Sequence, residues 1–240
     1  MLNQINLSHC QEQAEVVAAM AKVKAAYEMG DHMASLQAFR RYTRNGLDAA
    51  ISFHPVHQVP EEERKWAFEL MKTCVKEYYV RGGWGWNDRD KWQELTDETS
   101  CFLLARDAVS GSLLGFVSFR FDLDEGVEVL YCYEIHLSAE VRNKGLGKFL
   151  MQILELIAHR THMRKVMLTV FKENTLSSRF FREKMKYCED ETSPLYCDPL
   201  HAEEYTYSIF SKTLTRPAAK TSASTTPAAV PTSSSSSFST

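Results

Sequence analysis

The stretch Arg142-Asn143-Lys144-Gly145-Leu146-Gly147-Lys148 carries the most informative motif of this 240-residue chain. Its two glycines stand among basic residues directly before an amphipathic segment, so the backbone can approach a ligand where a helix begins. The first turn of a helix offers unpaired N–H groups at the positive end of its dipole. The motif therefore predicts an anion site, with pyrophosphate as the obvious occupant. It is not a Walker loop, because Phe149 follows Lys148 where Ser or Thr is required, and it lacks the third glycine of the dinucleotide fingerprint.

Apolar residues on both sides of this loop predict an α/β fold with a mixed central sheet flanked by helices. Three strand-like segments precede the loop, and the short turns between them suit antiparallel hairpins. They lie at 101–105, 113–121 and 128–137. One face of a helix follows, formed by Leu146, Phe149, Leu150, Ile153, Leu154 and Ile157. We expect a strand, a helix and a strand after it, at 166–171, 176–185 and 204–210.

The first part of the chain is predicted to be mostly helical. Helices are expected at 11–29, 32–44 and 60–80, with a strand at 49–53 after the turn signal Asn45-Gly46. The segment 81–86 is too rich in glycine for a helix and contains Trp84 and Trp86. These tryptophans either cover the edge of the core or bind a ligand.

The chain is expected to form a single domain with two appendages. Residues 1–44 are interpreted as an N-terminal helical segment packed on the core, and 45–216 as the main domain. The last stretch, 217–240, holds eight serines and no carboxylate. A segment of that composition cannot bury enough apolar surface to offset its ordering entropy, so we predict a disordered tail.

The charge balance excludes some classes of partner. With 28 Lys+Arg against 31 Asp+Glu and a net charge of -3, the chain is unlike a typical nucleic-acid binder, so no direct nucleic acid contact is expected. No apolar run reaches the roughly 18 residues that span a bilayer, so no membrane contact is expected either. The close pair His159 and His162 has no third ligand in view, and the cysteines form no CxxC pair. We therefore expect a soluble monomer without a metal.

The pattern RxxGxG between a long strand and an amphipathic helix resembles the acetyl-CoA pyrophosphate loop of the GNAT superfamily of acetyltransferases. The order of elements also fits, from about residue 49 to residue 210. More narrowly, several longer stretches are similar to the histone-directed N-terminal acetyltransferases of that superfamily. These stretches are 45–47, 84–86, 119–122, 128–134, 144–150 and 166–172.

The resemblance implies a GNAT-type fold, acetyl-CoA as co-substrate and no metal. It further implies acetylation of the N-terminal α-amine of histone tails beginning Ser-Gly-Arg-Gly, those of histones two-A and four. Histone substrates in turn imply residence in the nucleus and cytoplasm. Residues 1–15 hold no Lys or Arg that would form an import signal, so this location rests on the resemblance.

An α-amine is mostly protonated at neutral pH, since its reference pKa is near 8, and it must lose a proton before it attacks a thioester. Glu134 is the candidate base, because it lies late in the strand that precedes the phosphate loop. Strict alternation would put Tyr131 and Tyr133 on the opposite face. The resemblance implies a bulge that lets all three approach one cavity, with Glu134 acting through a water molecule and both tyrosines holding it and the substrate backbone.

The resemblance also implies a set of acetyl-CoA contacts along the strand end, the loop and the segment after the next strand. The residues are His136, Leu137, Ser138, Arg142, Lys144, Gly145, Leu146, Gly147, Lys148, Phe149 and Asn174. Backbone groups near Ile135 would polarise the thioester carbonyl.

Substrate selection is expected at an acidic hairpin. Asp122, Asp124 and Glu125 cluster there, and a pair of carboxylates can hold a guanidinium group; the alternative is a solvent-exposed turn. The resemblance implies a peptide groove lined by Tyr79, Trp84, Asp122, Leu123, Asp124, Tyr133, Thr169, Thr192 and Tyr207.

Three features depart from the family pattern. Many GNAT enzymes place a tyrosine that protonates the leaving thiolate where this chain has Phe180-Phe181. Asp124 and Thr192 stand where Glu and Ser are expected. Two alternatives therefore stay open: a catalytically weak or inactive paralogue that binds acetyl-CoA and histone tails, and an enzyme that acetylates small amines or lysine side chains.

Overall fold

The computed structural model describes residues 2–214. The expected disordered tail at 217–240 lies outside the described residues. Within them, no helix is both long enough and apolar enough to cross a membrane.

The core of the molecule is a mixed sheet of eight strands, in the order β1-β2-β3-β4-β5-β6-β8-β7. All neighbouring pairs are antiparallel except β5 and β6, which are parallel. The strands are β1 Arg41–Arg44, β2 Leu47–Pro55, β3 Cys101–Asp107, β4 Leu113–Asp124, β5 Val127–Leu137, β6 Lys165–Phe171, β7 Cys188–Glu189 and β8 Tyr207–Thr213. The predicted mixed α/β sheet in a single domain is confirmed.

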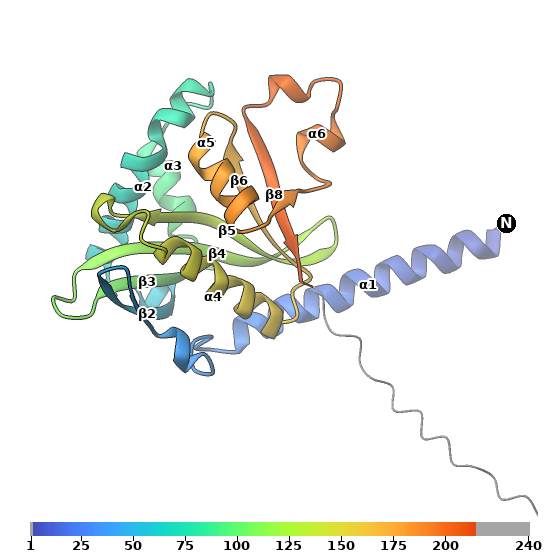
Figure 1. The fold of residues 1–240 in the computed structure, drawn as a ribbon. Coiled ribbons are helices and arrows are strands. Elements are labelled where there is room, and N and C mark those ends of the chain that lie inside the picture. The colour runs from blue at the N-terminus through green and yellow to red at the C-terminus, as the bar shows by residue number, and fades with distance from the viewer. Residues whose placement is uncertain (1, 215–240) are drawn as a thin grey trace, which may run out of the picture.

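Helices cover both faces of this sheet (Figure 1). They are α1 Leu2–Glu28, α2 Glu61–Arg81, α3 Asp88–Leu95, α4 Leu146–Arg160, α5 Thr175–Arg179 and α6 Pro194–Cys197. Alternate residues of β3 explain the two layers: Leu103 packs into the core under α4, whereas Phe102 and Leu104 pack into the core under α2 and α3. α1 packs on the α4 side through Ala26, and its first half extends beyond the sheet in Figure 1.

The predicted helix at 32–44 is wrong. Residues Gln37–Phe39 form one 3₁₀ turn, and Arg41–Arg44 is β1, which pairs with β2 across a tight turn. Asn45 and Gly46 both have positive φ, 53° and 71°, as a two-residue hairpin of this twist requires. Tertiary packing selects the hairpin, because Tyr42 is buried against Phe149. Residues 41–44 are therefore part of the sheet.

α3 is a helix that the sequence analysis missed. Its N-cap is Asn87, whose side chain accepts hydrogen bonds from the backbone N–H groups of Arg89 and Asp90. Asn87 and two aspartates in the first turn were the available signal.

Two irregularities of β5 create an opening in the sheet. Opposite β4, Ser118 pairs with Glu134 and Phe119 with Cys132, which leaves Tyr133 as the extra residue of a β-bulge. The bulge implied by the family resemblance is thus present. On the other side, β5 and β6 pair only from Val129 to Cys132, and both strands continue beyond the last pair.

Candidate active site

A groove of about 390 Å³ lies where β5 and β6 separate. This volume is typical of small-molecule sites. Its aromatic and hydroxyl side chains come from α2, the loop after it and three strands, and include Tyr79, Trp84, Tyr131, Tyr133, Thr169 and Tyr207. Glu134 and Asn174 also line it.

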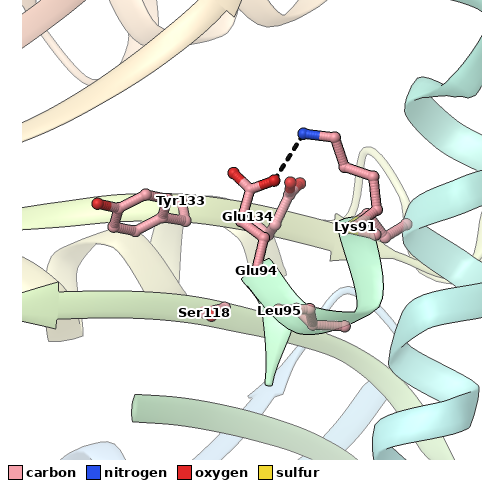
Figure 2. A pocket seen from close by; sticks show the side chains of 7 residues that line it. Lys91, Glu94, Leu95, Ser118, Tyr133 and Glu134 are labelled. Atoms are coloured by element: carbon pink, nitrogen blue, oxygen red, sulfur yellow. Dashed lines mark hydrogen bonds and ion pairs between the residues drawn. The ribbon is translucent and has the colours of Figure 1, made fainter. Parts of the chain in front are cut away.

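Glu134 lies beside a second, much smaller cavity of about 10 Å³. A cavity of that size has room for about one water molecule, which needs two to four polar partners. Lys91, Glu94 and Ser118 line the cavity with Glu134, and Lys91 Nζ donates to Glu94 Oε2 over 2.6 Å. In Figure 2 the side chains of Lys91, Glu94 and Glu134 point toward one another. The cavity can therefore hold a single water against the Glu134 carboxylate.

The two candidate tyrosines lie side by side in the groove. Their ring centroids are 4.9 Å apart, and Tyr131 Oη is 2.6 Å from Thr169 Oγ1. Burial raises the pKa of Tyr131 to about 12 and also raises the pKa of Tyr133, although the Arg120 guanidinium 4.5 Å above the Tyr133 ring opposes the shift. Both phenols therefore keep their protons at neutral pH and can donate hydrogen bonds.

The His136 side chain is buried between Glu134 and Cys74. Its Nε2 lies 2.5 Å from Glu134 Oε2, and it also hydrogen bonds to the Cys74 thiol. Burial alone lowers the pKa of His136, but the hydrogen bonds to Cys74 and Glu134 outweigh it and raise the pKa to about 9. The ring was expected among the acetyl-CoA contacts, and the structure places it beside the candidate base.

The open edge of β5 presents backbone N–H groups to the groove. Ser138 donates to the Leu114 carbonyl of β4 over 2.9 Å, and N–H groups alternate in direction along an antiparallel strand. Those of Ile135 and Leu137 consequently point away from β4, toward the side that β6 has left. They can pair with an extended ligand that carries amides, and the Ile135 N–H can polarise a carbonyl.

The start of α4 has the geometry that the predicted anion site requires, and pyrophosphate binding there stays a prediction. Gly145 precedes the helix with φ of 90°, and no side chain caps it, so the N–H groups of the first turn stay available. The side chains of Arg142 and Lys148 beside this turn are exposed, whereas Leu146 is buried and offers only its backbone. These features fit a pyrophosphate.

The β1–β2 hairpin holds this loop from outside. Tyr42 Oη donates to the carbonyl oxygen of Lys144 over 2.6 Å, and Asn45 Nδ2 donates to the same oxygen over 2.8 Å. A Cβ at Gly145 would lie 2.4 Å from Tyr42 Oη. Sequence reasoning missed the contact of Tyr42 because it assigned 32–44 to a helix, and it interpreted Asn45 only as part of the turn signal Asn45-Gly46, which was the clue to the hairpin.

The segment after β6 completes the groove. Asn174 caps α5 by accepting from the Ser177 N–H over 3.1 Å. Phe180–Lys184 forms a π-helical turn in which Phe181 is buried and lines the groove. Neither phenylalanine carries a proton to donate, so the departure noted in the sequence persists in the structure.

The expected peptide-binding residues fall into two groups. Tyr79, Trp84, Tyr133, Thr169 and Tyr207 line the groove, whereas Asp122, Leu123, Asp124 and Thr192 do not. Lys165 Nζ bridges Asp124 Oδ2 at 3.3 Å and Asp190 Oδ2 at 2.9 Å, and Thr192 Oγ1 donates to Asp190. Contact of this second group with a substrate stays a prediction. Among residues 2–214, no cluster of three His, Cys, Asp or Glu side chains could hold a metal.

Comparisons with known proteins identify the same fold. The model of the acetyltransferase (GNAT) family matches residues 64–187, which include Glu134 and the loop before α4. A GNAT-family acetyltransferase from Listeria monocytogenes superposes with a TM-score of 0.51 at 14% identity, over 72% of this chain and 99% of that chain. The NatC complex bound to Gag peptide and CoA gives 0.50 at 19% identity, over 69% and 99%.

Proposed function

This chain belongs to the GNAT family of acetyltransferases, and from that premise we propose that it acetylates the N-terminal α-amine of histone tails beginning Ser-Gly-Arg-Gly. The observation that carries the proposal is the position of Glu134, beside a cavity for one water at the groove between β5 and β6. The choice of histones two-A and four is supported by the likeness of residues 128–134 and 144–150 to the histone N-terminal acetyltransferase NatD.

The residues of the groove and loop fit acetyl-CoA, which supplies the thioester that the amine attacks. The first turn of α4, with Arg142, Lys144 and Lys148, would hold the pyrophosphate. The N–H groups of Ile135 and Leu137 would pair with the amides of the pantetheine arm.

Glu134 removes the proton that the amine must lose. It acts through a water in the small cavity, which Ser118 and Glu94 also line. General-base assistance of this kind contributes roughly 10²–10⁴-fold in rate. Tyr131 and Tyr133, whose pKa values are raised by burial, donate hydrogen bonds to the substrate backbone and the water.

The leaving group needs no acid from the protein. A thiol with a pKa of about 8.5 leaves as thiolate at modest cost near neutral pH. Phe181, which lines the groove, adds an apolar wall there and supplies no proton.

The peptide enters over the aromatic wall of the groove. Trp84 stands edge-on to Tyr207 at 5.3 Å and to Tyr79 at 5.9 Å, an arrangement that can enclose a small residue such as Ser or Gly. Asp122 and Asp124 then meet the arginine at the third position of the tail.

A transfer assay with peptide variants tests the proposal. Wild-type protein should acetylate a Ser-Gly-Arg-Gly peptide once, at its α-amine, as shown by fragment mass spectrometry. A peptide with its α-amine blocked should be inert, and replacing its arginine with alanine should raise KM. Glu134→Gln should lower kcat on the order of 10²–10⁴-fold with unchanged circular dichroism.

Other outcomes select the alternatives. Acetyl-CoA binding without transfer to any peptide would identify a binding protein. Preference for a free polyamine, or for the lysine side chain of a lysine-containing peptide with a blocked α-amine, would identify a different acceptor. Histone substrates also predict that a tagged full-length chain lies in the nucleus and cytoplasm. Separately, we propose a monomer, which size-exclusion chromatography tests.

A further inference from the structure

An unbroken line of polar contacts joins the phosphate loop to Glu134. Arg142 Nη2 lies 3.3 Å from Cys74 Sγ, Cys74 hydrogen bonds to His136, and His136 Nε2 lies 2.5 Å from Glu134 Oε2. The line crosses three elements, since Cys74 belongs to α2, His136 to β5 and Arg142 to the loop before α4. No step of the proposed reaction requires the imidazole of His136.

The surroundings of the ring make it a rigid donor. The His136 side chain is only 9% exposed, and the Phe116 ring of β4 lies 5.6 Å from it, so its partners are the carboxylate and the thiol. At neutral pH the ring carries its proton, because its pKa is raised to about 9. An imidazolium donates through both nitrogens, and here Nε2 faces Glu134 Oε2 while the ring also hydrogen bonds to Cys74.

Glu134 gains a fixed orientation from this contact. The hydrogen bond occupies Oε2 and leaves Oε1 for a water molecule. The carboxylate side chain would otherwise turn freely about its last bond, whose torsion is broad and two-fold.

We propose that His136 is a positioning residue, which holds the Glu134 carboxylate toward the one-water cavity and is itself held from behind by Cys74. Cys74 also contacts Arg142, so the same thiol lies between the side chain that holds Glu134 and the phosphate loop. This inference rests on the proposed function, from which the role of Glu134 as base is taken.

Two substitutions of His136 distinguish the loss of its hydrogen bond to Glu134 from a change in side-chain volume. His136→Leu removes the donor and should lower kcat on the order of 10²-fold, the effect of a misplaced catalytic group, while KM for acetyl-CoA stays within about twofold. His136→Gln keeps an N–H donor for Glu134 and should restore most of the rate. His159→Leu, on the exposed end of α4, is the matched control and should behave as wild type.

A double variant tests whether His136 acts through Glu134. In a Glu134→Gln background, His136→Leu should cause no further loss, because residues that act as a unit are not additive. The proposal is overturned if His136→Leu slows Glu134→Gln by the same factor as it slows wild type. It is also overturned if the Gln and Leu variants lose activity and Tm equally, which would mark a structural role.

A measurement without turnover keeps this inference apart from the proposed function. In protein with labelled histidine, the imidazole signal that disappears in His136→Gln should titrate near pH 9, and Glu134→Gln should lower its midpoint. A midpoint near the ordinary value in wild type refutes the positioning contact even if the peptide is acetylated. A midpoint near 9 in a protein that acetylates no peptide refutes the proposed function and leaves the contact standing.

Discussion

Gly145 combines a left-handed backbone conformation with a close contact to Tyr42, at the loop where we propose that the pyrophosphate binds. Its φ of 90° lies in the left-handed region, and any Cβ there would collide with Tyr42 Oη. Gly111, in the turn between β3 and β4, has a similar φ of 74° but open space around it. The two glycines therefore separate the cost of the backbone conformation from the cost of the collision.

Gly111→Ala should lower the free energy of unfolding by about 1–2 kcal/mol through its backbone conformation alone and leave KM for acetyl-CoA unchanged. Gly145→Ala should lower the free energy of unfolding by more than that and raise KM for acetyl-CoA about tenfold. The reason is that Tyr42 must move, and it holds the Lys144 carbonyl of the loop. Initial rates at varied acetyl-CoA, together with urea unfolding, measure both effects. Equal KM values for the two variants would mean that the loop does not need the Tyr42 contact.

Individual site residues differed in how well the sequence predicted them. Glu134 was predicted as the base from its place late in the strand before the phosphate loop, and the tyrosines were placed beside it through the bulge that the resemblance implies; the structure puts all three at one groove. The side-chain role of His136 was not predicted, because it depends on Cys74, which a different element brings beside it. Residue type and strand position cannot reveal such a partner.

Among the secondary structure elements, the β1–β2 hairpin holds the proposed phosphate loop in place through two hydrogen bonds, an arrangement called the clasp below. Tyr42 and Asn45 donate to one carbonyl oxygen, and that oxygen lies directly before Gly145. The hairpin thus fixes the conformation of the loop directly before the first turn of α4.

Loosening this clasp should weaken acetyl-CoA binding without unfolding the protein. Tyr42→Phe and Asn45→Gly each remove one hydrogen bond, worth about 0.5–1.5 kcal/mol, so each should raise KM for acetyl-CoA about 2- to 10-fold. Asn45→Gly suits the positive φ of 53° at this position, so the backbone is not strained. Tyr196→Phe, at an exposed tyrosine of α6, is the control. Unchanged KM in both variants would contradict the clasp.

Strands and helices with strong periodicity were predicted well, and elements fixed by tertiary contacts were not. α4 was read from its apolar face, and its observed bounds contain the whole predicted face. β1 was mistaken for helix, since Tyr42 of β1 becomes buried, and Phe39 of the preceding 3₁₀ turn partly buried, only by packing on Phe149 of α4. The opening between β5 and β6 could not be placed at all, because it depends on where two strands stop pairing.

Over the whole molecule, β5 separates two fields of opposite charge. The acidic hairpin of Asp122, Asp124 and Glu125 precedes its first residue, and the basic loop with Arg142 and Lys148 follows its last. Its 11 residues span about 35 Å at the usual strand rise. A net charge of -3 therefore conceals an uneven distribution of charge along β5, although Lys165 pairs with Asp124 at the acidic end.

The free energy of unfolding of the whole molecule should depend on pH through His32, which lies after α1 and packs against the sheet. The ring is 5% exposed and stands edge-on to Phe53 at 4.7 Å. Burial lowers the pKa of His32 to about 4, although the nearby Asp31 charge opposes the shift. The folded state therefore keeps this ring neutral at pH values where the unfolded chain protonates it.

Because only the unfolded state gains this proton between pH 6.5 and about 4, lowering the pH favours unfolding, by about 1.4 kcal/mol for each pH unit. His32→Phe keeps an aromatic ring between Phe53 and Phe121 and cannot titrate. Urea unfolding of both proteins isolates the effect: the free energy of unfolding of wild type relative to the variant should fall by about 2 kcal/mol from pH 7 to pH 5. A difference between the two proteins that is equal at both pH values would show that His32 is not buried as a neutral ring.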